Sequence, residues 1–187
     1  LIPYVRRLIE LTLDEDIDSS ASAPDKVMQS IYSAVFSAYA HGISSYDWNR
    51  TFLSRNRDDL DKAFGYFNDC VNEGELRKNF EATRKKIAAG PHPVSNQAFT
   101  KVGSFMAQAL EEEGGRDLLL SCKKRGPVAF FSDYIKLSNG NTAPKRYPRF
   151  KPDFIKVAAD WEKDWTRTYT ADVRRLFISP ATDFEEV

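Results

Sequence analysis

The stretch "PHPVSNQAFTKVGSFMAQALEEEGG", residues 91–115, reads as one helix with a full apolar face and a glycine inside it. Its apolar residues recur at the spacing of a helix, at positions 98, 102, 105, 106, 109 and 110. Ser95 is the expected N-cap, and the glycine pair that closes the stretch is the expected end. Gly103 costs about 1 kcal/mol relative to alanine in such a helix. The sequence therefore predicts that Gly103 is a close-packing position, where this helix meets the backbone of a helix ending at His41.

The same helical period runs through the rest of the chain, and strand-like alternation is nearly absent. Gly42 is expected to end the second helix, and residues 43–57 are expected to form a loop. We therefore predict an all-α fold, an irregular domain of about seven helices with a C-terminal helical arm. Besides the opening stretch, helices are expected at residues 3–13, 24–41, 58–71, 76–87, 116–124, 127–138 and 152–176.

One segment rich in proline and basic residues divides the chain. We expect a helical domain over residues 1–140, a linker over 141–151, and a C-terminal helix with an acidic tail over 152–187 that packs on the domain.

Composition excludes several classes of function. The 187 residues carry 27 Lys and Arg against 27 Asp and Glu, with a pI near 6.9, so a general electrostatic grip on nucleic acid is not expected. No apolar run is long enough to cross a membrane, and no signal-peptide pattern is present. The sequence does not indicate the cellular compartment of the protein. The partner we expect is a protein or a peptide.

Motifs for catalysis are missing from the chain. It contains no HExxH, no G-x-S-x-G and no phosphate-binding glycine motif. His92 lies between two prolines and is expected to be a loop residue, and His41 is expected to cap its helix. Cys70 and Cys122 are read as two buried thiols, with a disulfide as the alternative. We assign no catalytic residue and no cofactor from these patterns.

Two aromatic features offer binding surfaces. The segment "KRYPRFK" interleaves cations with aromatic rings, a pattern that can stack bases or follow phosphates. The alternative is a linker whose rings pack inward while its cations stay in water. Trp161 and Trp165, one turn apart, are expected to pack in the core, with a ligand platform as the alternative. The candidate partner-binding residues are Lys145, Arg146, Tyr147, Arg149 and Phe150.

The order of three motifs resembles the C-terminal helical half of a family of bacterial zinc-dependent peptidases with HExxH motifs, of the gluzincin type. These motifs are a helix with G-x-x-M-A-x-x-[IL]-E, a G-R-x-x-L helix and a P-x-x-F-F-x-x-Y helix. The matching residues are Gly103, Met106, Ala107, Leu110, Glu111, Gly115, Arg116, Leu119, Pro127, Phe130, Phe131 and Tyr134.

This resemblance implies a zinc site upstream, with HExxH on one helix and a glutamate ligand on a later segment. In this chain "IELTL" keeps only Glu10 of the first motif, and His41 stands where the later glutamate would be. Glu10 and His41 are the candidate metal ligands, and two side chains do not complete a catalytic zinc site. The resemblance also gives Gly103, Met106, Gly115, Arg116 and Pro127 structural roles.

Three functions follow as hypotheses. The first is a non-catalytic, zincin-like domain that binds a peptide or protein in a cleft between the first two helices and residues 95–110. The second is the C-terminal part of an active zinc-dependent peptidase, favoured by a chain that does not begin with methionine. Zinc is the cofactor only under this second hypothesis. The third is an unrelated helical module that binds a partner through "KRYPRFK" and the tryptophan helix.

Overall fold

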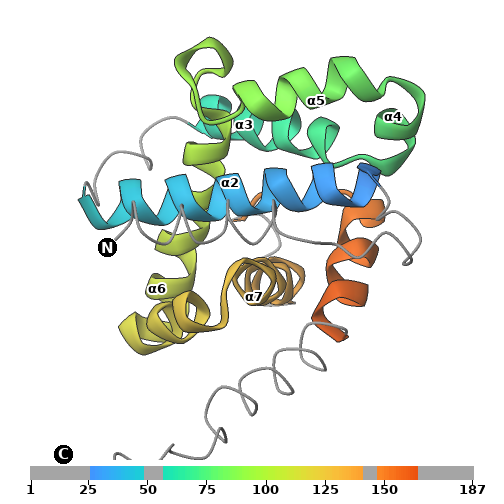
Figure 1. The fold of residues 1–187 in the computed structure, drawn as a ribbon. Coiled ribbons are helices and arrows are strands. Elements are labelled where there is room, and N and C mark those ends of the chain that lie inside the picture. Colours follow the sequence, from blue (N-terminus) through green and yellow to red (C-terminus); the bar gives the residue numbers. More distant parts are fainter. Residues whose placement is uncertain (1–25, 49–56, 141–146, 164–187) are drawn as a thin grey trace, which may run out of the picture.

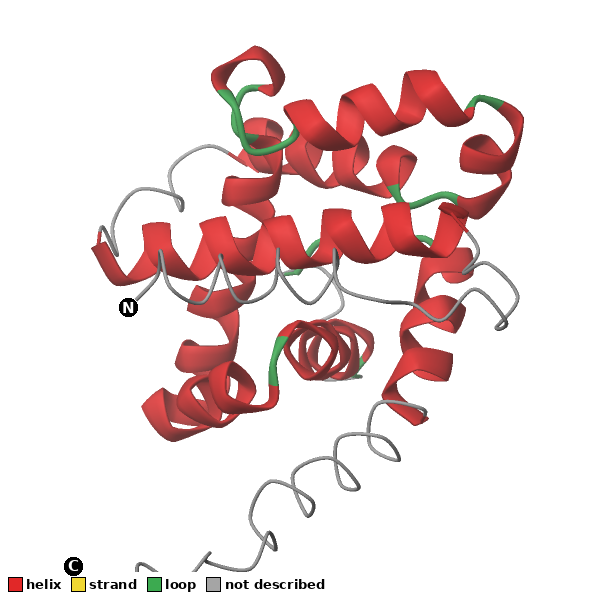
Figure 2. Cartoon of the chain, in the orientation of Figure 1, coloured by secondary structure: helices red, strands yellow, loops and turns green. Residues whose placement is uncertain are grey.

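A computed structural model describes residues 26–48, 57–140 and 147–163. These residues form helices and connecting loops without a strand, which confirms the predicted all-α class (Figure 2). Residues 152–163 are helical as well. The labelled elements are α2 (Lys26–Trp48), α3 (Arg57–Cys70), α4 (Glu73–Lys78), α5 (Phe80–Ala89), the 3₁₀ turn η1 (Pro93–Ser95), α6 (Ala98–Arg125) and α7 (Pro127–Asn139).

Helix α2 lies in the middle of the arrangement (Figure 1). Helices α3, α4 and α5 lie on one side of it and α7 on the other, while α6 crosses α2 and reaches both sides. Residues 152–163 pack beside the N-terminal end of α2. The two longest helices of the described residues therefore form a cross, and the shorter helices fill its quadrants.

The crossing of α2 and α6 is a contact between two glycines. A Cβ added to Gly103 would lie 1.9 Å from the carbonyl oxygen of Ala38 and 2.9 Å from the Cα of Gly42. A Cβ added to Gly42 would lie 2.3 Å from the Cα of Gly103. The hydroxyl of Ser104 donates to the Gly42 carbonyl at 2.8 Å. The backbones of α2 and α6 thus touch where the sequence places a glycine inside its best helix.

The course of α2 corrects two predictions. The helix does not end at Gly42 but continues to Trp48, so part of the stretch expected as a loop is helical. His41 consequently stands inside α2 and is not a C-cap. From sequence alone Gly42 predicts a helix end, because glycine commonly ends helices. Here it is an interior residue whose missing side chain lets α6 approach.

The start of α6 corrects another prediction. Ser95 belongs to η1, and α6 begins at Ala98 with Gln97 at its N-cap position. The Ser95 hydroxyl lies 2.8–2.9 Å from the carbonyl oxygens of Ala89, Gly90 and His92, so it closes the preceding turn. Asn96 and Gln97 both have left-handed backbone conformations, with φ of 56° and 54°. The chain therefore turns sharply before it enters α6.

The end of the opening stretch agrees with the sequence. Gly115 has φ of 74° and ψ of 175°, which interrupts the helical course of α6 and separates its first part from the segment that follows. Glycine adopts such an angle without the steric cost other residues have. Pro127 stands at the start of α7, which runs to Asn139.

An aromatic cluster forms the centre of the core. Phe67 of α3 stacks on Phe131 of α7 with ring centroids 5.5 Å apart, and Phe154 contacts both rings edge-on. Phe150 lies against the same rings. Residues 147–163 are thereby anchored on the helices of the domain, because their aromatic side chains complete its core.

Candidate functional site

The two candidate metal ligands do not meet in the described part of the chain. Glu10 lies outside the described residues, and His41 is exposed on α2. Within residues 26–48, 57–140 and 147–163, no group of three or more His, Cys, Asp or Glu side chains could hold a metal ion. A catalytic zinc ion needs three protein ligands. The donors of the described core therefore do not fit zinc.

Both cysteines are buried, free thiols, as the sequence predicts. Burial raises the pKa of Cys70 to about 12. Burial likewise raises the pKa of Cys122 to about 12, helped by its hydrogen bond to Asp133 at 3.1 Å. The nucleophilic form of cysteine is the thiolate. Neither side chain is therefore a nucleophile at neutral pH.

The candidate partner-binding segment has its rings inside the fold. Tyr147 and Phe150 are each 4% exposed, and the Tyr147 hydroxyl donates to Glu113 at 2.5 Å. Arg149 is exposed, and its Nε donates to the Ser138 carbonyl at 3.1 Å. Lys145 and Arg146 lie outside the described residues. The rings thus follow the packing interpretation, and partner binding by this segment stays a prediction that rests on its cations.

A polar cluster joins the C-terminal end of α2 to α6. The Tyr46 hydroxyl donates to the Glu111 carboxylate at 2.5 Å, and Arg116 approaches the same carboxylate at 3.4 Å. Arg116 also lies 3.6 Å from Asp47, which pairs with Lys123 at 2.5 Å. Glu111 and Arg116 come from motifs that carry the peptidase resemblance, whereas Tyr46 and Asp47 were expected in a loop. Recognising that α2 continues past Gly42 would have placed them here.

The charged groups of this cluster are paired with each other. Its two carboxylates and two cations balance, so it presents no net charge to a ligand. The Glu111 side chain is 17% exposed, and two donors already occupy it. A third tie supports the junction, since the Tyr39 hydroxyl donates to the Lys123 carbonyl at 2.9 Å. The cluster holds α2 and α6 together around the break at Gly115.

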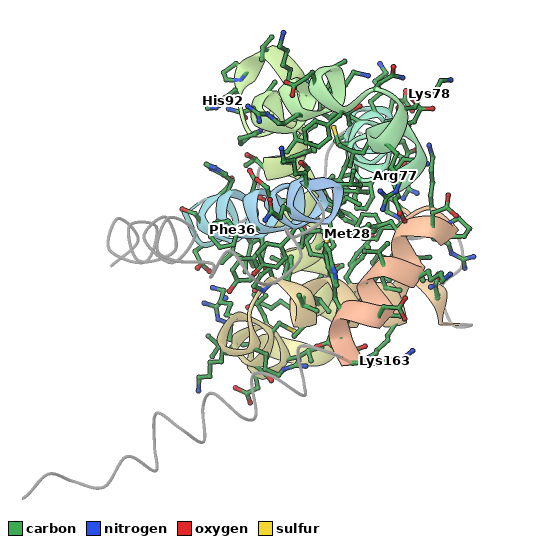
Figure 3. The ribbon with its side chains drawn as sticks, turned by 45° about the vertical axis from the view of Figure 1, so that its right-hand side comes forward. Met28, Phe36, Arg77, Lys78, His92 and Lys163 are labelled. Carbon is green, nitrogen blue, oxygen red and sulfur yellow. The ribbon has the colours of Figure 1, made fainter. Side chains whose placement is uncertain are left out.

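The N-terminal half of α2 borders a groove of about 520 Å³, which we call the α4 groove. It lies between α2, α4 and residues 152–163, and Figure 3 shows Met28 and Arg77 close to this last helix. Half-buried apolar side chains line part of it, namely Met28, Val157 and Trp161. The charged lining residues are Glu73, Arg77, Asp153, Lys156 and Asp160.

A second groove, of about 330 Å³, lies on α2 beside α5, and we call it the α5 groove. Its lining is mostly polar and small, with one cation, Arg84. Ser30 donates its hydroxyl to the Lys26 carbonyl at 2.9 Å and so satisfies itself within α2. The α5 groove has Ile87 and Ala88 as its apolar lining and lacks an aromatic ring.

The cleft expected between the early helices and residues 95–110 takes a different form. Where α2 crosses this stretch the two backbones touch, so that crossing has no room for a peptide. Of the expected tryptophan pair, Trp161 lines the α4 groove, and Trp165 lies outside the described residues. In the described part of the chain, every helix is too short or too polar to cross a membrane.

Comparison with known proteins gives one family. Residues 42–143 match the family described as "Putative zinc dependent peptidase (DUF5700)", which confirms the resemblance carried by the sequence motifs. The match covers more than half of the 187 residues and begins at Gly42. It includes the glycine crossing, the polar cluster and the whole of α7. No curated protein and no solved structure matches the chain.

Proposed function

The chain belongs to this family of zinc-dependent peptidases, and we propose that its helical core acts as a non-catalytic module that binds a peptide or a protein. The observation that carries the proposal is the match over residues 42–143. Within the described part of that range, the donors do not fit zinc and the thiols are buried. The feature of a peptidase that this core supports best is therefore contact with peptide.

The open half of α2 supports the same role. Grooves of about 330 and 520 Å³ lie on it, and sites for small ligands have volumes of roughly 300–1,000 Å³. The polar cluster at the other end of α2 is already paired internally. A peptide thus has open surface on one half of α2 and closed contacts on the other.

Binding and hydrolysis can be tested in the same samples. We would titrate the purified chain into a fluorescein-labelled tryptic digest of casein and follow fluorescence anisotropy. The same mixtures would be analysed by mass spectrometry after long incubation, with zinc and with a chelator. We expect a saturable rise in anisotropy and peptides that remain intact. An absence of binding across the digest would overturn the proposal.

The family description favours a second candidate, an active zinc-dependent peptidase whose ligands lie outside the described residues. Metal analysis of the purified chain separates the two candidates. The proposal predicts less than one equivalent of zinc and no effect of His41→Ala on the metal content. One tightly bound zinc per chain that His41→Ala removes, together with zinc-dependent cleavage of the digest, would establish the second candidate. Family membership is at odds with a module unrelated to peptidases.

A further inference from the structure

We infer that the α4 groove is the surface that takes the peptide, and that its ligand is a short segment with one large apolar side chain flanked by charges of both signs. The inference rests on the proposed function. It names the location and the peptide chemistry, which the family match does not supply.

The apolar part of the groove suits one large side chain. Met28, Val157 and Trp161 are half-buried and come from two different elements, so they converge on the same space. The Trp161 ring is held edge-on by Tyr32, with centroids 5.7 Å apart. Tryptophan is enriched among residues that dominate binding, and methionine adapts its shape to different side chains. The three residues therefore combine an indole ring that is held in place, that of Trp161, with the flexible side chain of Met28.

The charges at the rim are of both signs and lie along one helix. Asp153 and Asp160 bracket Lys156, and neither Asp153 nor Lys156 has an ion pair with another residue of the described chain. Seven residues of helix span about 10 Å, which is the length of about three residues of extended peptide. A peptide that places a cation near one aspartate and an anion near Lys156 complements this rim. The groove thus fits a segment of about three residues.

The opposite wall of the groove, formed by α4, has its charges paired with each other. Arg77 of α4 pairs with Glu73 at 2.8 Å, so it contributes little free charge. Gly74 lies beside this pair and leaves the wall open, since an added Cβ would meet the Asn72 side chain at 3.3 Å and nothing closer. A longer side chain at position 74 would therefore reduce access to the groove without a clash against backbone.

Comparison of the two grooves decides between them. The α5 groove is smaller, lacks an aromatic ring and carries a single cation, Arg84. Burial of a large apolar side chain is the main source of affinity that a short peptide can offer. The α4 groove provides for such burial and the α5 groove does not.

The test uses two matched glycine variants of the full chain. Gly74→Gln places a side chain at the α4 groove. Gly65→Gln places the same side chain at an exposed position of α3, where an added Cβ meets nothing within 4 Å. Gly65→Gln replaces a helical glycine in open space, so it should unfold at the same or a higher urea concentration than the wild type. At position 74 the added Cβ lies 3.3 Å from Oδ1 of Asn72, which caps α4, so urea denaturation of Gly74→Gln checks that this variant is folded before its affinity is compared. The probes are blocked, fluorescein-labelled peptides with a central Lys-Phe-Glu or Lys-Ser-Glu.

We expect the Lys-Phe-Glu probe to bind the wild type and Gly65→Gln equally, and Gly74→Gln about tenfold more weakly. The Lys-Ser-Glu probe should bind about tenfold more weakly to the wild type, because it has no apolar side chain to bury. Equal affinity of Gly74→Gln and Gly65→Gln would overturn the location, and equal affinity of the two probes would overturn the apolar anchor. In both cases binding of the casein digest would leave the proposed function standing. If the digest also fails to bind, the proposed function itself is wrong.

Discussion

The two halves of α2 have opposite relations to their surroundings. In the C-terminal half, from Ala38 to Asp47, Gly42 touches the backbone of α6 and the last turn is tied by hydrogen bonds and ion pairs. In the N-terminal half, from Met28 to Ser37, the helix borders two grooves and presents a row of serines. The family match begins at Gly42, so it contains the last two turns of the closed half and none of the open half.

The difference teaches how one helix can serve two purposes. Close backbone contact and paired charges fix the position of α2 relative to α6, and a helix that is fixed at one end holds its other end in place as well. The open half buries one side in the core through Ile31, Ala34 and Val35, and its outer side carries the surface of the two grooves. Substitutions in the closed half should therefore change stability, whereas substitutions of the groove-lining residues in the open half should change binding.

The largest effect is expected at the crossing itself. Gly103→Ala would place a Cβ 1.9 Å from the Ala38 carbonyl oxygen, so the two helices must move apart. Overpacking in a core costs about 1–3 kcal/mol and occasionally more. We expect a loss of about 3 kcal/mol in the free energy of unfolding, measured by urea denaturation, which exceeds the gain of about 1 kcal/mol in helix propensity. Gly65→Ala is the control and should raise stability, so equal or greater stability of Gly103→Ala would contradict the crossing.

Alkaline pH should loosen the same half of α2. Burial raises the pKa of Tyr39 to about 12, and the pKa of Cys122 is also raised to about 12. Folding favours the neutral form of both groups. Each group's contribution to the free energy of unfolding is therefore fully present below its unfolded pKa, which is about 8.5 for cysteine and about 10 for tyrosine. Stability should fall as the pH rises from about 9 towards 12.

Urea denaturation across this pH range checks the prediction. Cys122→Ala removes one of the two groups, and the decline should then be shallower, with the buried thiol of Cys70 still contributing to it. A free energy of unfolding that stays constant to pH 11 would show that the two groups titrate alike in the folded and unfolded chains.

A smaller effect is expected for the hydrogen bond at the crossing. Ser104→Ala removes the donor to the Gly42 carbonyl while leaving room for the helices. We expect a loss of about 1 kcal/mol, the usual net value of one buried hydrogen bond. Differential scanning calorimetry would measure it. A neutral result would mean that backbone packing alone holds the crossing.

The ion pairs of the polar cluster should contribute still less. Arg116 is 40% exposed and approaches its two carboxylates only at 3.4 and 3.6 Å. Arg116→Ala should therefore cost about 0.5 kcal/mol at low salt and less at high salt, because salt screens exposed charges. Thermal denaturation at two salt concentrations provides the measurement, and a salt-independent loss would indicate lost packing instead.

An equally small effect, of the opposite sign, is expected in the open half. Ser33 is exposed and lines the α5 groove, so Ser33→Ala removes no buried contact. Alanine is the better helix former, and stability should rise by about 0.5 kcal/mol. Urea denaturation is again the measurement. A loss of stability would show that the serine row takes part in the fold, which would remove the contrast between the two halves.

Much of the fold could be predicted from local signals. Pro127 and the Asn139–Gly140 pair bracket α7, and Gly115 marks the break in α6, because proline and glycine restrict or free the backbone wherever they stand. Apolar residues at helical spacing identified the buried faces. These features depend on neighbours in the sequence alone.

Features that depend on tertiary contacts could not be predicted in the same way. Gly42 has the local signature of a helix end, and only its contact with Gly103 makes an interior position favourable. Ser95 has the signature of an N-cap, but the turn at Asn96 and Gln97 draws its hydroxyl back to earlier carbonyls. The grooves on α2 depend on how α4 and residues 152–163 sit beside it. No local residue pattern predicts the placement of these elements beside α2.

The contact between Gly42 and Gly103 has a consequence for how related chains can diverge. Most pairs of touching residues can exchange volume, because a larger side chain on one helix is compensated by a smaller one on the other. Here each glycine is already the smallest residue, and the atoms that touch belong to the backbone. A substitution at one position therefore has no compensating partner at the other. Across relatives the pair should stay fixed together rather than vary together, and it would give no signal of correlated change although the two residues are in contact.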